Sequence, residues 1–247
     1  MSDFSLIAER YDDLRPAGRG WQELAELTLA RLAGATRLLD LGCGTGRFAV
    51  LAQERLGCLT WGVDSSPEML AEAKARRPGG RGIGWKLGDA RALPFKDGWF
   101  DAAHLHLVLH LIDDRRRVLG ELQRVLTPGG RLVIVTFRPQ HFTGFHLNRY
   151  FPSIPAIDSA RFADPELVAA ELAGLGFSST RAEPFTQRVS LEPADLLERV
   201  RGRYISTLQH LPADEYARGL ELLARDVAAG RAPTETVLEW SLVSALR

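Results

Sequence analysis

The chain has 247 residues, of which 45% are hydrophobic and 25% are charged. These proportions are typical of a globular protein and exclude a disordered, collagen-like or disulfide-scaffold chain. Basic and acidic residues balance at 31 each, so no net charge attracts the chain to a nucleic acid or an anionic membrane. The length favours a single α/β domain.

The two cysteines, Cys43 and Cys58, are too few for a disulfide framework. The N-terminus lacks a basic stretch followed by an apolar run, and no apolar segment is long enough to cross a membrane. We therefore expect a cytoplasmic protein without a membrane span. Its oligomeric state is not predicted.

Apolar runs alternate with amphipathic segments between residues 37 and 137. Strands are predicted at residues 37–41, 59–63, 83–87 and 131–137. A fourth strand is predicted within the longer apolar segment 99–109, which is expected to turn into a loop or helix at its end. Helices are predicted at residues 47–56 and 67–77, and a third, capped by Asp113 or Asp114, ends at the turn 128–130. Near-continuous apolar strands separated by helices predict a doubly wound α/β fold with a mostly parallel sheet.

The pattern changes after Phe137. Residues 138–162 are rich in proline and aromatic residues, which indicates a lid of loop character. Its aromatic side chains either form plain core or line an apolar substrate pocket. Further on, a helix is predicted from residue 165 to Gly176, strands at 180–190 and 236–246, and helices at 193–207 and 212–229. We expect one domain, with an N-terminal cap (1–36), an α/β core (37–137), a lid (138–163), and a C-terminal sheet portion (164–247) containing a helical insertion (193–229).

A glycine loop follows the first predicted strand. It reads Asp40-Leu41-Gly42-Cys43-Gly44-Thr45-Gly46, and glycines there allow positive φ and close approach of a ligand to the backbone. Eighteen residues later Asp64 ends the second strand, where a carboxylate can accept both hydroxyls of a ribose. The acidic Asp40 favours a ligand that also carries a positive charge. A dinucleotide loop would need a third glycine where this chain has Arg47.

Five segments resemble, in order and spacing, the class I S-adenosylmethionine-dependent methyltransferases, particularly the small-molecule group that includes ubiquinone and menaquinone enzymes. They are LLDLGCGTG (38–46), GVDSSPEML (62–70), GDARALPF (88–95), FDAAHLHLVLHLID (100–113) and LTPGGRLVI (126–134). The resemblance implies a Rossmann-like sheet of seven strands, mostly parallel with the last strand antiparallel. It also implies that S-adenosylmethionine is the cofactor.

The resemblance further assigns cofactor-binding positions. The methionine portion would lie against Asp40, Gly42, Cys43, Gly44 and Gly46, with the backbone of Leu105 and His106 at its amino group. Asp64 would hold the ribose, and Ser65, Met69, Asp89 and Ala90 would surround the adenine. The segment with Tyr11 and Arg15 is similar to one that closes over the cofactor in relatives.

Three histidines near the end of the fourth strand are candidates for acid and base chemistry, because histidine titrates near neutral pH. Of these we select His106 and His110 as catalytic candidates, while a purely structural role stays open for each, and more so for His104. Cys43 is interpreted as a small loop residue, since no adjacent base would activate its thiol. No metal site is expected, because the histidines lack further ligands at suitable spacing.

We therefore predict methyl transfer from S-adenosylmethionine to a small, partly apolar organic acceptor, releasing S-adenosylhomocysteine. The sequence does not distinguish an O, N or C acceptor atom, and a dedicated base is optional. Two alternatives remain: a non-catalytic protein that binds the cofactor, and an NAD-dependent oxidoreductase, which Arg47 disfavours.

Overall fold

The structure, a computed structural model, describes residues 4–247. Its strands are β1 (Arg37–Leu41), β2 (Leu59–Asp64), β3 (Ile83–Leu87), β4 (Phe100–His106), β5 (Leu126–Phe137), β6 (Ser178–Ser190) and β7 (Glu235–Leu246). Its α-helices are α1 (Tyr11–Leu14), α2 (Arg19–Arg31), α3 (Arg47–Leu56), α4 (Pro67–Arg76), α5 (Arg115–Val125), α6 (Pro139–Gly144), α7 (Ile154–Arg161), α8 (Pro165–Gly174), α9 (Pro193–Arg201) and α10 (Ala213–Ala228). Three 3-10 helices are η1 (Ser5–Arg10), η2 (Leu109–Leu111) and η3 (Ser206–Gln209).

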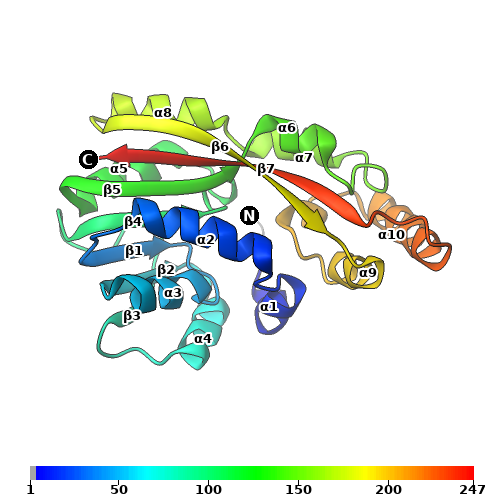
Figure 1. Cartoon of the computed structure of the whole chain (residues 1–247), viewed down its shortest axis with the longest axis horizontal. Helices are drawn as coiled ribbons and strands as arrows, with labels where there is room; N and C mark the ends of the chain where they lie inside the picture. The colour runs from blue at the N-terminus through cyan, green and yellow to red at the C-terminus, as the bar shows by residue number, and fades with distance from the viewer. Residues whose placement is uncertain (1–3) are drawn as a thin grey trace.

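The strands form one twisted sheet in the order β3-β2-β1-β4-β5-β7-β6 (Figure 1). Pairing is parallel from β3 through to β5. Within residues 4–247 only β7 runs antiparallel, against both β5 and β6. The predicted fold class, seven strands with an antiparallel last strand, is confirmed.

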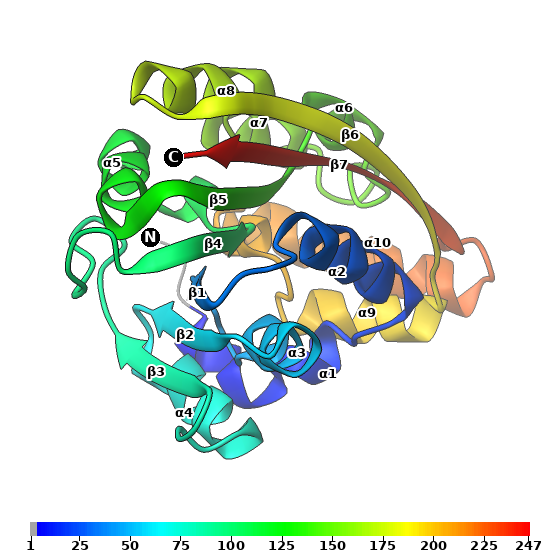
Figure 2. The ribbon, with the colours of Figure 1, turned by 60° about the vertical axis from the view of Figure 1, so that its left-hand side comes forward.

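Helices cover both faces of the sheet (Figure 2). On one face α2 and α3 pack Leu24, Leu29 and Phe48 against the strands. On the other, α5 and α8 contribute apolar side chains such as Leu122 and Leu172. Because both faces are buried, the central strands are apolar along most of their length.

Local signals explain the helix starts. The Ser66 hydroxyl accepts the Met69 N–H at 3.1 Å, with Pro67 in the first turn of α4. Of the two aspartates considered for α5, Asp114 is the N-cap and accepts the Arg117 N–H at 3.1 Å. These bonds satisfy backbone donors that the first turn of a helix leaves unpaired.

Some boundaries differ from the predictions. The fourth strand ends at His106, because Leu107 adopts a left-handed φ of 54°, and η2 follows, as expected for a segment that turns into a loop or helix at its end. The fifth strand starts five residues early, at Leu126, because the turn at 128–130 pairs with the C-terminus through Gly129 N–H to Arg247 O at 2.6 Å. The helix predicted at 193–207 ends at Arg201, and η3 follows after the non-helical residues 202–205. Helix α2 had no sequence prediction.

Residues 138–162 are largely helical, as α6 and α7, where a loop was expected. They share a separate apolar core, here called the cap core, with α9, η3 and α10. It comprises Phe145, Leu147, Tyr150, Phe151, Ile154, Leu191, Leu196, Leu197, Val200, Leu208, Leu211, Leu223 and Ala232. Figure 1 shows β6 and β7 extending beyond the other strands to reach these helices. Two segments distant in sequence thus form one unit at that end of the sheet.

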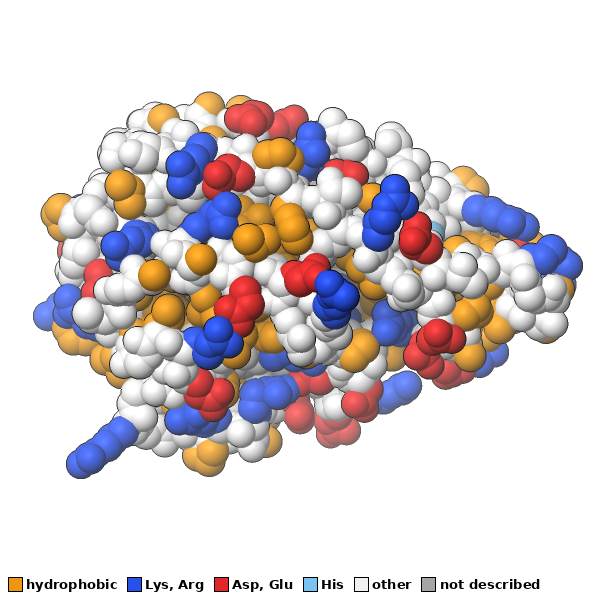
Figure 3. Space-filling view, viewed as in Figure 1, with side chains coloured by type: hydrophobic (Ala, Val, Ile, Leu, Met, Phe, Trp, Pro, Cys, Tyr) orange, Lys and Arg blue, Asp and Glu red, His pale blue; other side chains and the backbone are white. Residues whose placement is uncertain are grey.

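The surface carries interspersed charges of both signs over the face shown in Figure 3. No helix among residues 4–247 is long and apolar enough to cross a membrane.

Candidate active site

The glycine loop connects β1 to α3 and is folded tightly. Gly42, Gly44 and Gly46 have φ of 70°, 53° and 74°, values that other residues rarely adopt. The N–H groups of Gly42 and Cys43 both donate to the Val63 carbonyl, at 2.7 and 3.0 Å. The loop is therefore fixed to the end of β2.

The three glycines meet different surroundings. A Cβ added at Gly42 would lie 2.3 Å from Val108, and one at Gly46 would lie 2.4 Å from the Trp85 ring. A Cβ at Gly44 would meet nothing within 4 Å. Gly42 and Gly46 are thus required for packing, whereas Gly44 borders open space.

Asp64, at the end of β2, lies beside this open side. Its Oδ2 accepts the Gly44 N–H at 2.8 Å and its Oδ1 accepts the Ser66 N–H at 3.0 Å. Burial raises the pKa of Asp64, an effect that these backbone N–H donors oppose. The carboxylate is held rigidly and keeps lone pairs for a ligand.

Asp40 is buried on β1 and pairs with His104 on β4. Its Oδ1 lies 2.8 Å from His104 Nδ1, and the two residues are 3% and 1% exposed. Phe48 lies over the imidazole at 3.8 Å between centroids. The second oxygen of Asp40, Oδ2, has no hydrogen-bond partner among residues 4–247. A buried carboxylate oxygen without a partner is costly, and a cationic ligand group would satisfy it.

The N-terminal segment is anchored over the glycine loop by Asp12. This carboxylate accepts from the Thr45 hydroxyl at 2.9 Å and forms ion pairs with Arg47, at 2.7 Å, and with Arg76. Asp12 was absent from the predicted site, although the motif that supplied Tyr11 and Arg15 contains it.

Tyr11 and Arg15 lie together in the N-terminal segment. Arg15 Nη1 donates to the Tyr11 hydroxyl at 2.8 Å, and its Nε donates to the Tyr204 carbonyl at 2.7 Å. Because Tyr204 follows α9, Arg15 connects the N-terminal segment to the cap core side of the molecule.

His106 ends β4, and its ring lies in a T-shaped arrangement with the Trp240 ring, with 5.7 Å between the ring centroids. Burial, together with the charges of His104 and Arg15, lowers the pKa of His106 to about 3. The imidazole is therefore neutral at neutral pH, and its low pKa makes it a weak base.

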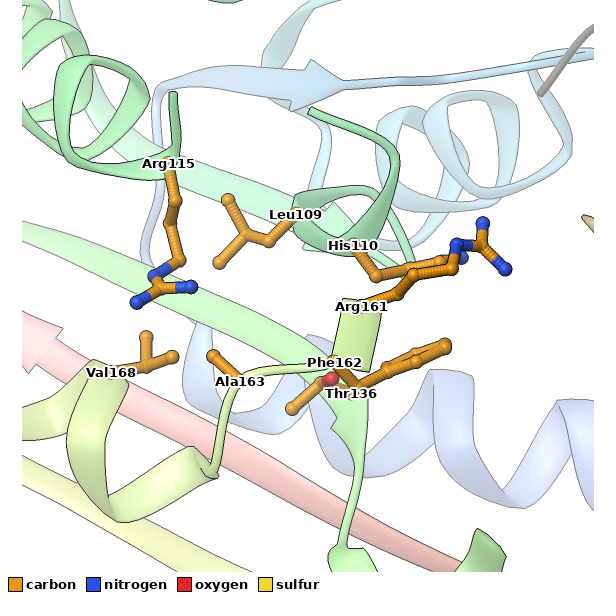
Figure 4. A pocket seen from close by; sticks show the side chains of 8 residues that line it. All are labelled: Leu109, His110, Arg115, Thr136, Arg161, Phe162, Ala163 and Val168. Atoms are coloured by element: carbon orange, nitrogen blue, oxygen red, sulfur yellow. The ribbon is translucent and has the colours of Figure 1, made fainter. Parts of the chain in front are cut away.

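His110, in η2, stacks on Phe162 with 3.9 Å between centroids and 11° between planes. Burial is also the main cause that lowers the pKa of His110. Figure 4 shows the recess that it lines with Arg161, Phe162 and Arg115. Arg115 is not available to a ligand charge there, because it forms a bidentate pair with Glu171 at 2.8 and 2.7 Å.

The positions expected around adenine follow the ends of β2 and β3. Asp89 is exposed, and Arg91 binds its carboxylate through both the backbone N–H and the guanidinium, at 2.8 to 3.1 Å. These bonds hold the pKa of Asp89 below its usual value. Met69 and Ala90 are buried and Ser65 is exposed. The Leu105 side chain is fully buried, so only its backbone can face a ligand.

Cys43 lies inside the loop as a free thiol. Burial, and then the charges of Asp40 and Asp64, raise its pKa well above the usual value. The thiolate is disfavoured, which agrees with the interpretation that Cys43 is not a nucleophile.

Comparison with known proteins identifies the family of this chain. A family model described as "Methyltransferase domain" matches residues 39–134. Demethylmenaquinone methyltransferase of Thermus thermophilus is 37% identical over 202 residues, covering 71% of this chain and 91% of that protein. The enzyme of the same name from Thermotoga maritima is 38% identical over 176 residues, covering 66% and 75%.

The chain belongs to the class I S-adenosylmethionine-dependent methyltransferases.

Solved structures show the same fold for this methyltransferase. A putative methyltransferase from an antibiotic biosynthesis pathway of Anabaena variabilis superposes with a TM-score of 0.72 at 20% identity, covering 91% of this chain and 96% of that one. S-adenosylmethionine is accordingly the cofactor, and the comparisons support neither the non-catalytic alternative nor the NAD-dependent one.

The observed residues fit this cofactor. The unpartnered Oδ2 of Asp40 suits a cationic amino group, the open side of Gly44 admits a ligand against the backbone, and the Asp64 carboxylate suits vicinal hydroxyls. The methyltransferase thus has suitable groups for the amino group and the ribose hydroxyls of the cofactor.

Proposed function

We propose that the enzyme methylates a small, partly apolar acceptor that lies between the end of β4 and the cap core. The observation that carries this proposal is a series of stacked rings there. The ring centroids of Trp240 and Phe137 are 4.1 Å apart, and those of Phe137 and His141 are 3.8 Å apart. His110 stacks on Phe162 nearby. Ligands of open α/β sheets bind beyond the carboxyl ends of the strands, which is where β4 and β5 end.

In this proposal the cofactor lies across the glycine loop. Asp40 binds its amino group and Asp64 its ribose hydroxyls. The remaining contacts, kept as predicted, are Tyr11, Arg15, Gly42, Cys43, Gly44, Gly46, Ser65, Met69, Asp89, Ala90, Leu105 and His106. The cofactor supplies a methyl group on a positively charged sulfur.

The chain's own part is mainly alignment. Holding an acceptor in line with the methyl group can lower a barrier by up to about 7–11 kcal/mol. His106 and His110 assist the acceptor as neutral imidazoles through hydrogen bonds. The surrounding apolar rings exclude water, which strengthens those bonds.

A flat, largely apolar ring is the acceptor we favour. Stacked aromatic side chains offer such a ring both area and suitable geometry. The relatives named above are demethylmenaquinone methyltransferases, and a 2-phytyl-1,4-naphthoquinone methyltransferase from Nostoc punctiforme is 36% identical over 169 residues. These names agree with a fused-ring acceptor.

We also propose that the enzyme acts in the cytoplasm on a free small molecule. Cys43 and Cys58 are both free, as is usual in a reducing compartment. The balanced charge of the chain offers nucleic acid no long-range attraction.

The test uses S-adenosylmethionine labelled on its methyl group. Candidate acceptors are a reduced naphthoquinone with a short isoprenoid chain, a malonyl thioester, tRNA and a peptide, and Asp40→Asn serves as the matched control. We expect label in the naphthoquinone product with the wild-type enzyme and a strong loss with Asp40→Asn. Label only in tRNA or peptide would refute the proposal.

A further inference from the structure

A short chain of hydrogen bonds leads from α7 to His110. Arg161 Nη2 donates to Ser206 Oγ at 2.9 Å, and Ser206 Oγ lies 3.4 Å from His110 Nε2. Figure 4 shows the Arg161, His110 and Phe162 side chains gathered at one end of the recess. Ser206 itself is 4% exposed, so its hydroxyl is sequestered from bulk water.

The direction of these bonds follows from the chemistry of the groups. A guanidinium only donates, so the Ser206 oxygen accepts from Arg161. The hydroxyl hydrogen then needs an acceptor, and of the two partners that the described structure gives to Ser206 only His110 Nε2 has a lone pair. Ser206 therefore donates to Nε2, since a buried hydroxyl without an acceptor would be costly.

This bond determines where His110 carries its hydrogen. Burial, with the charges of Arg161, Arg15 and His210, lowers the pKa of His110, so the ring is neutral at neutral pH. A neutral imidazole carries one hydrogen, which lies on Nδ1 when Nε2 accepts. Stacking on Phe162 at an angle of 11° fixes the ring plane.

We propose that Arg161 and Ser206 are positioning residues that hold His110 as the Nδ1–H tautomer, and thereby make it a hydrogen-bond donor to the methyl acceptor rather than a base. The tautomer is independent of the proposed function, whereas the role towards the acceptor rests on it. A donor at this place selects acceptors that present a lone pair, such as a carbonyl or oxyanion oxygen. The lone pair that a base would use is already occupied by Ser206.

Nitrogen NMR of the histidine rings tests the tautomer without any substrate. The full chain labelled with ¹⁵N is examined at neutral pH through two-bond couplings to the ring carbon hydrogens, and His110→Gln identifies the signals. We expect a hydrogen on Nδ1 of His110 in the wild type. In Ser206→Ala we expect the hydrogen to move to Nε2, and in Ser206→Thr to return to Nδ1.

Thr207→Ala is the matched control. Thr207 is the neighbouring buried hydroxyl, but it donates to Asp158 at 2.6 Å and not to His110, so this variant should keep the Nδ1–H tautomer. A wild-type ring with its hydrogen on Nε2, a doubly protonated ring, or an Nδ1–H tautomer that survives in Ser206→Ala would each overturn the assignment.

Kinetics separate this inference from the proposed function. With a methylated acceptor in hand, Ser206→Ala should reduce kcat at least tenfold while the Kd of S-adenosylhomocysteine stays within twofold of the wild type. An unchanged kcat together with the expected tautomer shift would refute the donor role alone. Failure of every small acceptor would refute the proposed function and leave the tautomer assignment standing.

Discussion

The different surroundings of Gly44 and Gly46 give two alanine variants with distinct expected effects, mainly on stability at Gly46 and mainly on cofactor affinity at Gly44. Each replacement places a side chain at positive φ, with φ of 53° at Gly44 and 74° at Gly46, a strain of about 1–2 kcal/mol. In Gly46→Ala the new methyl also meets the Trp85 ring at 2.4 Å and Ala73 Cβ at 3.0 Å. The ring cannot swing away freely, because Trp85 Nε1 donates to the Arg77 carbonyl at 2.9 Å. Overpacking adds about 1–3 kcal/mol.

Gly46→Ala should therefore lose about 2–5 kcal/mol of stability, and its Tm should fall by about 4–20 °C for a chain of this size. Gly44→Ala bears only the strain, and its Tm should fall by about 2–8 °C. Its methyl group, however, occupies the open side of the loop, so the Kd of S-adenosylmethionine should rise at least about tenfold.

Calorimetric melting and titration of both variants check this reasoning. Equal Tm values for the two would contradict the packing argument at Gly46. Wild-type affinity in Gly44→Ala would show that the open side of Gly44 does not face the cofactor.

Three other outcomes follow from single contacts. Asp64→Asn should weaken S-adenosylhomocysteine binding by about 1.5–3 kcal/mol, roughly 10- to 150-fold, because a charged acceptor is lost. Unchanged affinity in titration calorimetry would refute the assignment of Asp64 to the ribose. Asp12→Asn should release the N-terminal segment from Thr45, Arg47 and Arg76. Hydrogen exchange should then be faster in residues 11–15 and unchanged in β1 and β4. Slow exchange in residues 11–15 as well as in the two strands would argue against this anchoring role. The pKa of His141 is lowered to about 3, mainly by burial. As the pH falls below about 6.5, His141 therefore binds a proton in the unfolded state but not in the folded state. Between pH 7.5 and 5 this histidine should lower the free energy of unfolding by about 2 kcal/mol. In urea unfolding, the drop between these pH values should be smaller by this amount in His141→Phe than in the wild type. Equal drops in both proteins would contradict the burial argument.

Patterns confined to neighbouring residues predicted the fold well. The apolar runs gave β1 and β3 with their observed limits, and the Ser66 to Pro67 pair located the start of α4. The segment 138–162 was less predictable from its own sequence. Its helices bury their apolar side chains against α9 and α10, which lie more than 30 residues further along the chain.

The motifs predicted candidate site positions, but they did not predict contacts that depend on which strands are neighbours. The pairing of Asp40 with His104 arises because β1 lies next to β4 in the sheet, and nothing local to either residue indicates that order. Ser206 likewise meets His110 across 96 positions. Which of the motif positions contact the cofactor stays a prediction.

The most direct test of the account is a crystal structure with S-adenosylhomocysteine. The account predicts ribose hydroxyls within hydrogen-bond distance of the Asp64 carboxylate, an amino group beside the free Oδ2 of Asp40, and backbone contact at Gly44. A ligand whose ribose lies away from Asp64, or whose amino group leaves Asp40 Oδ2 without a partner, would contradict it.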